Sequence, residues 1–575
     1  ACGTAFEVKK WLKDDQTVLL CDKAAMERSG AVAQGLSAIN TYIGDNAKED
    51  YVRMVRNDLM GLVREDLIYD LGCHVDDSVY LFEEWGLPVW KKSEDGKNMD
   101  GKKGQKMGTL KSGAQPVRTG KWQIMINGES YKRIVAEAAK LALGEDNIIE
   151  RCFIVELLLD ANVPNQIAGA VGFSVRENLV YIIKCKTMMV ACGGAVNIYQ
   201  PRSVGEGKGR AWYPVWNAGS TYTMAMKVGA ELTMMENRFT PARFKDGYGP
   251  VGAWFLLFKA KTLNGLGEAF AGSDAAKAEL EKYAPYGTAA ITPTCLRNHL
   301  MLFEMKEGRG PIIMDTVTAL AELGKTMDKK ELKHLESEAW EDFLDMTCGQ
   351  ANLWCATNTE PEKKNSEVMP TEPYLLGSHS GCCGLWTSGP DFDWVPDAYK
   401  LKYKDKVYNR MTTVNGLFTS GDGVGCSGHK FSSGSHAEGR YAGKQAIRFI
   451  LDNNSQPAVD DGKVEELKKA TFAPMELFES NKGFTTDADI NPAYIRPMQF
   501  MFRLQKLMDE YAGGVSSAFK TSKSLLERGV ELLAMLKEDA DKLGAEDSRS
   551  NIVGLRKDDY DGSPVLKGFA HNMFK

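Results

Sequence analysis

The segment that most constrains the fold is a short apolar strand that ends in Asp22, followed by the glycine- and alanine-rich run ERSGAVAQGLSAINTY at 27–42. An acidic residue that closes a second strand is what a ribose-binding Rossmann unit uses to bind ribose hydroxyls. Glycine and alanine directly after it allow a large planar cofactor to approach the backbone closely. The segment therefore predicts a dinucleotide-binding α/β domain near the start of the chain.

The length and composition indicate a globular protein of several domains. A chain of 575 residues is too long for one hydrophobic core and predicts roughly two to four domains. Its net charge of -6, without a basic block, gives no reason to expect nucleic-acid binding, and no apolar run is long enough to cross a bilayer. The twelve cysteines contain no CxxC pair, so we predict no metal site and free thiols in a reducing cytoplasm.

The pattern of elements changes three times along the chain. From Arg238 to about Thr371 alternating strands give way to helices and loops, which predicts an inserted capping domain. A strand–turn–helix pattern at 414–443 returns the chain to the nucleotide domain, and helices dominate beyond about Asp460. We therefore predict a nucleotide-binding domain in two parts, 1–237 and 372–460, a capping domain at 238–371 and a helical domain at 461–575.

Three separated segments resemble the flavin-binding segments of one protein family. The run at 27–42, MMVACGGAVN at 188–197 and VNGLFTSGDGVG at 414–425 resemble, in the same order, those of the fumarate reductase/succinate dehydrogenase flavoproteins. Each glycine-rich turn alone is a weak signal, because most such turns only make tight connections. Gly3, Asp22, the stretch 29–37 and the turn 421–423 are four such pieces in the right order. Four in that order, hundreds of residues apart, are hard to obtain by accident and identify the chain as a member of this family.

The resemblance implies the fold, the cofactor and the residues that bind it. The implied fold is α/β, with a Rossmann-like FAD-binding domain, an inserted α+β capping domain and a C-terminal helical domain. Gly30 stands where many members have a histidine that bonds covalently to the flavin, so non-covalent FAD is implied. The implied cofactor-binding residues are Gly3, Asp22, Lys23, Ser29, Gly30, Gln34, Gly35, Ser37, Gly193, Gly194, Gly421, Asp422 and Ser435.

Departures from the family pattern argue against a dicarboxylate substrate. Thr240 replaces the histidine of the family's QFHP motif, and Pro293-Thr294 replace the Arg-Asp of RDVVSR. After His379, the first of two paired glycines is Cys383. Buried carboxylates need cationic and hydrogen-bonding partners, so a pocket that lacks these groups is poorly matched to fumarate or succinate.

Other residues resemble the adenylylsulfate reductase alpha-subunit branch of the family. They are Arg243 and the segment GYGPVGAWFLLFK at 247–259. This resemblance implies two-electron interconversion of adenylyl sulfate with AMP and sulfite, through a sulfite adduct at flavin N5, in dissimilatory sulfur metabolism. Arg243 and Arg297 would hold the anionic substrate and the leaving AMP, and His379 would bind a substrate oxygen. The rest of the implied pocket consists of Asn40 and Glu129 as polar groups and of Trp212, Gly252, Phe255 and Leu256.

The electrons must come from another protein, because the chain has neither cluster ligands nor an evident nicotinamide site. The resemblance implies an iron–sulfur beta subunit that carries the [4Fe–4S] clusters, and a peripheral link to a membrane electron donor. Two alternatives stay open: a dicarboxylate oxidoreductase of the same fold, and a non-catalytic FAD-fold scaffold for an electron-transfer partner. Each candidate also has a structural interpretation, such as an interdomain ion pair for an arginine or a helix-dipole contact for Glu129.

Both ends of the sequence fall inside the family pattern. Gly3 matches the last glycine of GxGxxG, without the strand and glycines that precede it, and the family's arginine-rich C-terminal stretch does not occur before Lys575. We therefore expect an internal piece of a longer subunit. Because half of the dinucleotide turn is missing, we expect this piece alone to bind FAD poorly.

Overall fold

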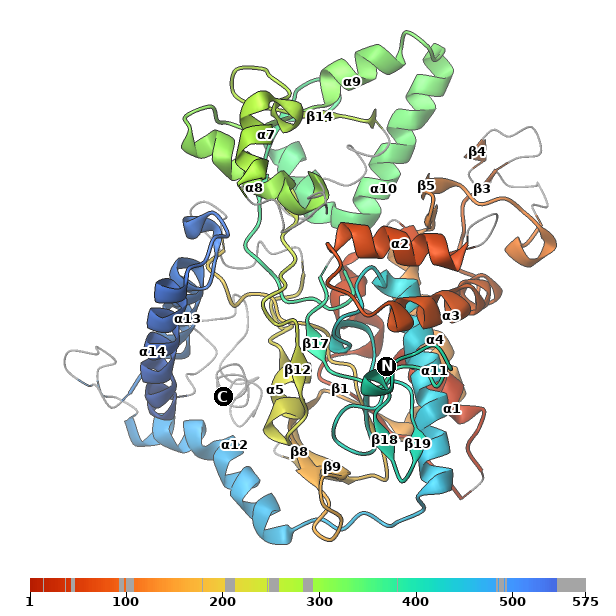
Figure 1. Cartoon of the computed structure of the whole chain (residues 1–575), viewed down its shortest axis with the longest axis vertical. Coiled ribbons are helices and arrows are strands. Elements are labelled where there is room, and N and C mark those ends of the chain that lie inside the picture. Colours follow the sequence, from red (N-terminus) through yellow and green to blue (C-terminus); the bar gives the residue numbers. More distant parts are fainter. Residues whose placement is uncertain are drawn as a thin grey trace.

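The computed structural model describes residues 1–13, 15–36, 38–42, 47–92, 98–99, 108–177, 179–201, 213–245, 247, 258–282, 293–379, 381–481, 484, 491 and 494–544. Figure 1 shows three regions: a nucleotide-binding region around the N-terminus, a green cap above it, and a blue set of helices along one side. This mixture of helices and strands confirms the predicted fold class. The domain boundaries after 237, 371 and 460 remain predictions.

Short parallel strand pairs form the nucleotide-binding region. Residues Leu20, Cys21 and Asp22 of β1 pair in parallel with Ile148, Ile149 and Glu150 of β7, so both strands end at the same edge. The second pair joins β11 (Met188–Val190) to β20 (Leu417–Thr419), also in parallel. Segments more than 200 residues apart therefore lie side by side, which is how the chain returns to this region after the cap.

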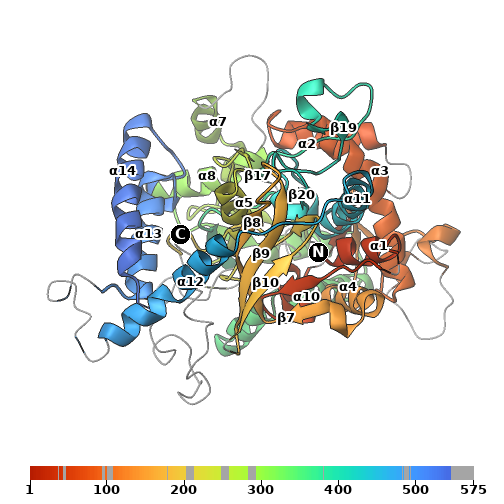
Figure 2. The same cartoon turned by 90° about the horizontal axis from the view of Figure 1, so that it is seen from below.

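An antiparallel sheet follows β7 directly. Its strand order is β10-β9-β8, and the bounds are Cys152–Leu159 for β8, Ile167–Ser174 for β9 and Val180–Lys184 for β10. Every residue of β9 is buried, because Val171 and Phe173 pack into one hydrophobic cluster and Ile167 and Ala170 into another. The sheet crosses the middle of the molecule between the nucleotide-binding helices and the C-terminal helices (Figure 2).

Two helices pack closely beside the strand ends. They are α1 (Cys2–Lys9) and α11 (Phe431–Asp452), with α3 (Glu65–Glu84) and α4 (Gly128–Leu143) against them. A Cβ atom on Gly3 would lie 2.4 Å from the carbonyl oxygen of His436, so only glycine permits this approach of α1 to α11. The Asn127 side chain caps α4 by accepting a hydrogen bond from Ser130 N at 3.1 Å.

A left-handed turn interrupts one stretch of apolar periodicity. A single helix over 48–70 fits the pattern, but the chain forms α2 (Lys48–Asp58) and then the separate α3. Met60 and Gly61 between them have φ values of 55° and 81°. A left-handed pair ends a helix whatever the side-chain periodicity on either side of it.

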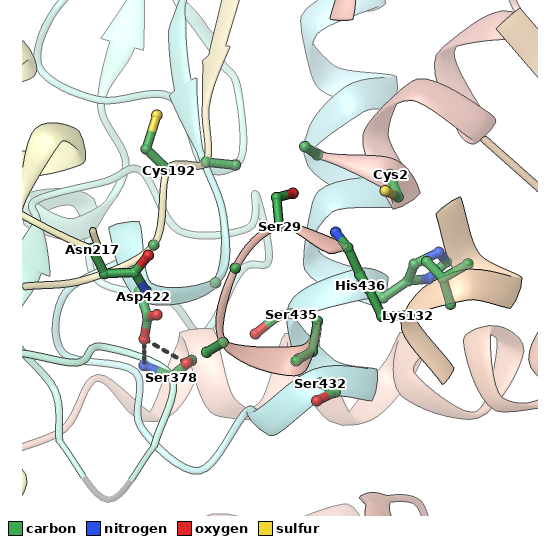
Figure 3. Close-up of a pocket in the computed structure, with 18 of the residues that line it drawn as sticks. Cys2, Ser29, Lys132, Cys192, Asn217, Ser378, Asp422, Ser432, Ser435 and His436 are labelled. Carbon is green, nitrogen blue, oxygen red and sulfur yellow. Dashed lines mark hydrogen bonds between the residues drawn. The ribbon is translucent and has the colours of Figure 1, made fainter. Parts of the chain in front are cut away.

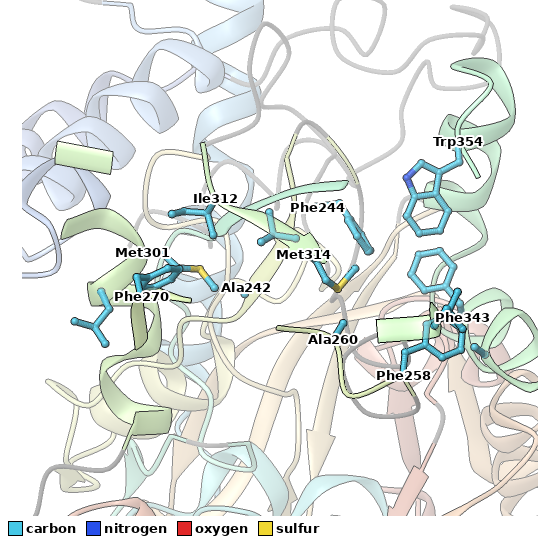
Figure 4. Close-up of a cluster of buried hydrophobic side chains, with 14 of the residues drawn as sticks. Ala242, Phe244, Phe258, Ala260, Phe270, Met301, Ile312, Met314, Phe343 and Trp354 are labelled. Atoms are coloured by element: carbon cyan, nitrogen blue, oxygen red, sulfur yellow. The ribbon is translucent and has the colours of Figure 1, made fainter. Parts of the chain in front are cut away.

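The cap consists of an antiparallel sheet and helices. The sheet order is β13-β16-β15-β14, and the bounds are Ala242–Phe244, Ser366–Pro370, Ile313–Asp315 and Lys261–Leu263. The helices are α7 (Asp274–Glu281), α8 (Pro293–Lys306), α9 (Thr316–Leu323) and α10 (Lys329–Ala356). Buried aromatic rings hold these layers together (Figure 4), with Phe343 stacked on Trp354 at 4.7 Å and Phe244 edge-on to Trp354 at 4.8 Å.

The last region contains α12 (Asp461–Asn481), α13 (Pro497–Tyr511) and α14 (Lys523–Asp539). Ile495, Phe500, Leu536, Ala540 and Leu543 form its small core. The leucines of α14 are only partly covered, because Leu536 is buried whereas Leu525 and Leu526 are exposed. Among the helices that the structure describes, none is both long and apolar enough to span a membrane.

The remaining elements are short and connect these regions. They are α5 (Ser220–Lys227), β2 (Ala38–Asn40) with β6 (Gln123–Met125) and β5 (Arg118–Gly120), β3 (Lys91–Lys92) with β4 (Asn98–Met99), β12 (Leu232–Thr233) with β17 (Gly384–Leu385), and β18 (Lys402–Tyr403) with β19 (Lys406–Val407).

Candidate functional site

A cavity of about 530 Å³ lies where the strand ends, the glycine-rich run and the first turns of α1 and α11 meet (Figure 3). It gathers segments from the start, the middle and the end of the nucleotide-binding region. Of the residues proposed to bind the cofactor, those that line it are Gly3, Asp22, Lys23, Ser29, Gly30, Gly35, Gly193, Gly421, Asp422 and Ser435. The cavity therefore has a volume in the range of small-molecule and cofactor sites and a glycine-rich wall that exposes the backbone.

Three of the proposed cofactor residues are not placed on this wall. Gly194 lies behind it, where a Cβ atom would be 2.2 Å from the carbonyl oxygen of Leu375. Gln34 ends the turn Ala31–Gln34, but its side chain lies outside the described part of the chain, as does the whole of Ser37.

Asp22 joins the end of β1 to the glycine-rich run. Its Oδ1 accepts a hydrogen bond from Ala24 N at 2.7 Å, and its Oδ2 accepts one from the Ser29 hydroxyl at 2.6 Å. A carboxylate has about four acceptor positions, so both oxygens keep capacity for hydroxyl groups of a ligand. Asp22 therefore holds the glycine-rich run in place and also faces the cavity.

Two glycines give the run its shape. Gly30 has φ 80° and ψ 176°, and Gly35 has φ 115° and ψ 158°, on either side of the turn between them. These conformations are essentially restricted to glycine. No heavy atom lies within 4 Å of a Cβ built on Gly30, so the backbone conformation, rather than crowding, requires glycine there.

The turn Gly421–Gly423 forms the opposite wall. Gly421 has φ 64°, and the Asp422 carboxylate accepts hydrogen bonds from both the backbone N and the hydroxyl of Ser378 (Figure 3). These two hydrogen bonds hold the carboxylate against Ser378 and so fix the conformation of the turn, whose backbone also faces the cavity. Because Ser378 directly precedes His379, the same contact joins this turn to His379.

His379 lines the cavity among aromatic rings. Its imidazole stacks on Phe239 with centroids 4.2 Å apart, and the rings of Phe431 and Tyr213 lie at 4.7 and 6.2 Å. Burial, with a smaller contribution from His429, lowers the pKa of His379 to about 3. The imidazole is therefore neutral at pH 7, so it can donate or accept a hydrogen bond but does not supply a positive charge.

Arg243 is buried one layer behind that wall. Its side chain is 1% exposed, and Nη2 lies 3.9 Å from Oε2 of Glu372. The other oxygen of Glu372 accepts a hydrogen bond from Tyr374 at 3.1 Å, and the Tyr374 ring lies edge-on to Tyr213 at 5.9 Å. Arg243 is thus connected to the cavity through three residues, although it does not line it.

The other predicted arginine lies on α8. The side chain of Arg297 is outside the described residues, but the amide of its neighbour Asn298 donates a hydrogen bond to the carbonyl of Thr240. This turn of α8 therefore meets the segment that leads into Arg243. Trp212, Gly252, Phe255 and Leu256 also lie outside the described residues.

Asn40 and Glu129 do not line the cavity. The Asn40 amide is buried and donates to the carbonyl of His429 at 2.6 Å and to the hydroxyl of Tyr51 at 3.2 Å. Glu129 is exposed in the first turn of α4, where interaction with the helix dipole is sufficient to explain it. In this structure, Asn40 holds the backbone of His429 in place, and Glu129 is a surface residue.

Sequence reasoning missed two histidines beside the site. His429 Nε2 lies 2.6 Å from Asp58 Oδ2, and its backbone N donates to the His379 carbonyl at 2.6 Å. His436 lines the cavity, and burial keeps its pKa well below the ordinary value. Both lie in the motif SGHKFSSGSH at 427–436, where two histidines beside a glycine-rich turn were the available signal.

The parallel strand pairs, the acidic strand end and the glycine-shaped cavity under a cap together define an FAD-binding flavoprotein. The adenylylsulfate reductase subunit alpha of Megalodesulfovibrio gigas is 64% identical over 551 residues, which cover 95% of this chain and 83% of that protein. The chain belongs to the adenylylsulfate reductase alpha-subunit family, whose members are flavin-dependent oxidoreductases that act on sulfur compounds. The predicted family and enzyme class are confirmed.

Solved structures agree with this assignment. The adenylylsulfate reductase of Archaeoglobus fulgidus and an adenosine-5-phosphosulfate reductase in complex with sulfite, as a covalent adduct, each have a TM-score of 0.88 and 51% identity, covering 100% of this chain and 85% of theirs. A quinol fumarate reductase of E. coli has a TM-score of 0.66 at 15% identity over 100% of this chain and 85% of its own, which shows the common fold alone. No family model matches the chain.

Proposed function

We propose that the chain is the catalytic flavoprotein subunit that interconverts adenylyl sulfate with AMP and sulfite. In the reducing direction, sulfur accepts two electrons, the bond between sulfur and the bridging phosphate oxygen breaks, and AMP leaves with that oxygen. The observation that carries the proposal is the cavity itself. It combines the flavin-binding segments with His379 in a chain that is 64% identical to an adenylylsulfate reductase subunit alpha.

The described residues fit FAD bound without a covalent link. Asp22 offers acceptors for ribose hydroxyls, and the backbone of the Gly421 turn and the first turn of α11 face the cavity, where a diphosphate can be bound. Gly30 has no side chain with which to bond the ring. FAD would supply a two-electron centre and the N5 atom to which sulfite binds, as the covalent sulfite adduct of a relative supports.

The cavity wall suits a substrate that is held by hydrogen bonds near aromatic rings. The neutral imidazole of His379 would bind a substrate oxygen, and the rings of Tyr213, Phe239 and Phe431 fix its orientation. Arg243 and Arg297 would supply positive charge for the phosphosulfate group. Arg243 does not line the cavity and is paired with Glu372, so it meets this requirement only if these contacts rearrange.

Electrons would pass to or from an iron–sulfur beta subunit that carries the [4Fe–4S] clusters. Support comes from the relatives, of which one is named as an alpha subunit. A cytoplasmic location and a peripheral link to a membrane electron donor remain predictions.

One assay tests the function. The subunit, purified together with its partner, should reduce ferricyanide only when AMP and sulfite are both present, and succinate should not replace them. Activity with succinate alone would favour the dicarboxylate oxidoreductase. A protein that contains FAD but is inactive with both substrates would favour the non-catalytic scaffold.

A further inference from the structure

A group of four buried charges lies directly behind the flavin-facing turn. Lys430, Glu438 and Arg410 have fully buried side chains, and Asp70 is 3% exposed. Arg410 Nε donates to Glu438 at 2.8 Å, and its Nη1 lies 3.3 Å from Asp70. Two positive and two negative groups make the cluster neutral as a whole, which is the condition for burying charge in a protein interior.

Two members of this group bind the N–H and the C=O of Gly421 in the turn. Glu438 Oε2 accepts a hydrogen bond from Gly421 N at 2.7 Å. Lys430 Nζ donates to the carbonyl of Gly421 and to that of Val424 at 3.1 Å, and lies 3.4 Å from Glu438. An ammonium group has three N–H donors, and here it meets three acceptors.

Lys430 also stands next to a second wall of the cavity. Lys430 precedes the first residue of α11, and Phe431 and Ser432, which follow it, line the cavity. Ser420, Gly421 and Asp422 line it from the turn, whereas Lys430 and Glu438 themselves do not. The lysine therefore ties the turn to the start of the helix at the place where a bound flavin would pass between them.

We propose that Lys430 and Glu438 are positioning residues that preform the flavin-binding turn and so set the affinity for FAD without contacting it. The inference rests on the proposed flavin function. The turn needs such support because Gly421 is in a left-handed conformation and flexible glycines stand at both 421 and 423. Preorganisation raises affinity because less conformational freedom is lost when the ligand binds.

The test compares FAD affinity in fluorescence titrations of the full apo-subunit. We expect Lys430→Met to weaken FAD binding about tenfold or more, since the charge-assisted hydrogen bonds to the carbonyls of Gly421 and Val424 are lost. Lys444→Met is the matched control, because Lys444 is a half-exposed lysine on the same helix, bonded to Glu7 rather than to the turn. Equal affinity in wild type and Lys430→Met would overturn the inference.

A double variant separates support of the turn from charge balance. Lys430→Met with Glu438→Gln removes one charge of each sign and leaves Arg410 paired with Asp70. If the lysine only balances charge, the double variant regains wild-type FAD affinity and the inference fails. If it holds the turn, the double variant binds FAD as weakly as Lys430→Met does, because the carbonyls of Gly421 and Val424 still lack their donor.

If the variants do not fold, hydrogen exchange of the wild-type apo-protein tests whether the turn is preformed. The Gly421 amide should be strongly protected without FAD, because its N–H is bonded to a buried carboxylate. Fast exchange would show that the turn is not preformed and would refute the inference. Failure of the wild type to bind any FAD would instead refute the proposed cofactor, and the exchange measurement would still test the turn.

Discussion

The neutral state of His379 leads to a defined pH dependence of stability. Its pKa is lowered from 6.5 to about 3 in the folded protein, chiefly by burial. Below pH 6.5 the unfolded chain therefore binds a proton that the folded chain does not. The stability that this residue contributes is complete above pH 6.5 and is lost as the pH falls toward 3.

The size of the effect follows from the two pKa values. At about pH 5, roughly 1.5 units below the unfolded pKa, the loss is about 2 kcal/mol at about 1.36 kcal/mol per unit. We expect the unfolding free energy of wild-type apo-protein to fall by this amount more than that of His379→Gln between about pH 8 and about pH 5. Urea unfolding at the two pH values measures the difference.

The control is a histidine whose ring is half-exposed. His334 lies on α10 with a side chain that is 49% exposed, 3.2 Å from Glu338. His334→Gln shows what the removal of a half-exposed histidine does by itself under the same conditions. If wild type and His379→Gln lose stability in parallel, the imidazole is not held neutral by burial, and the assignment of His379 as an uncharged hydrogen-bonding group is refuted.

Three further substitutions test the architecture of the site. Gly3→Ala places a Cβ 2.4 Å from a backbone oxygen of α11 and should cost about 1–3 kcal/mol, seen as a lower melting temperature; Gly272→Ala, with open space around it, should not, and equal melting of both would contradict the packing argument. Arg243→Met leaves Glu372 buried opposite an apolar group and should cost about 3–5 kcal/mol, much of it recovered when Glu372→Gln is added; no recovery would exclude the ion pair as the cause. Gly30→Ala forces alanine into a glycine-only conformation, so about 1–3 kcal/mol should be lost and FAD retained poorly after gel filtration; full retention would mean that the run adapts.

The backbone conformations that the cavity wall requires could be predicted from the sequence. Gly30, Gly35 and Gly421 all have backbone conformations that favour glycine, and Asp22 ends a strand as predicted. Such positions are readable because a positive φ or a strand end restricts the residue type directly, whatever surrounds it. The resemblance to known flavoproteins rests on these same positions, and the family assignment was confirmed.

Contacts between distant segments could not be read in the same way. The Asn40 amide donates to the carbonyl of His429, 389 residues away. Arg243 is paired with Glu372 and does not line the cavity. Lys430 and Glu438 gave no signal at all, since a lysine and a glutamate eight residues apart are ordinary on a helix. Residue type and spacing specify backbone conformation and periodicity, but the direction in which a side chain points depends on what the rest of the chain packs against it. The order of the flavin-binding segments was therefore inherent in the sequence, whereas the partners of their side chains arose from packing across hundreds of residues.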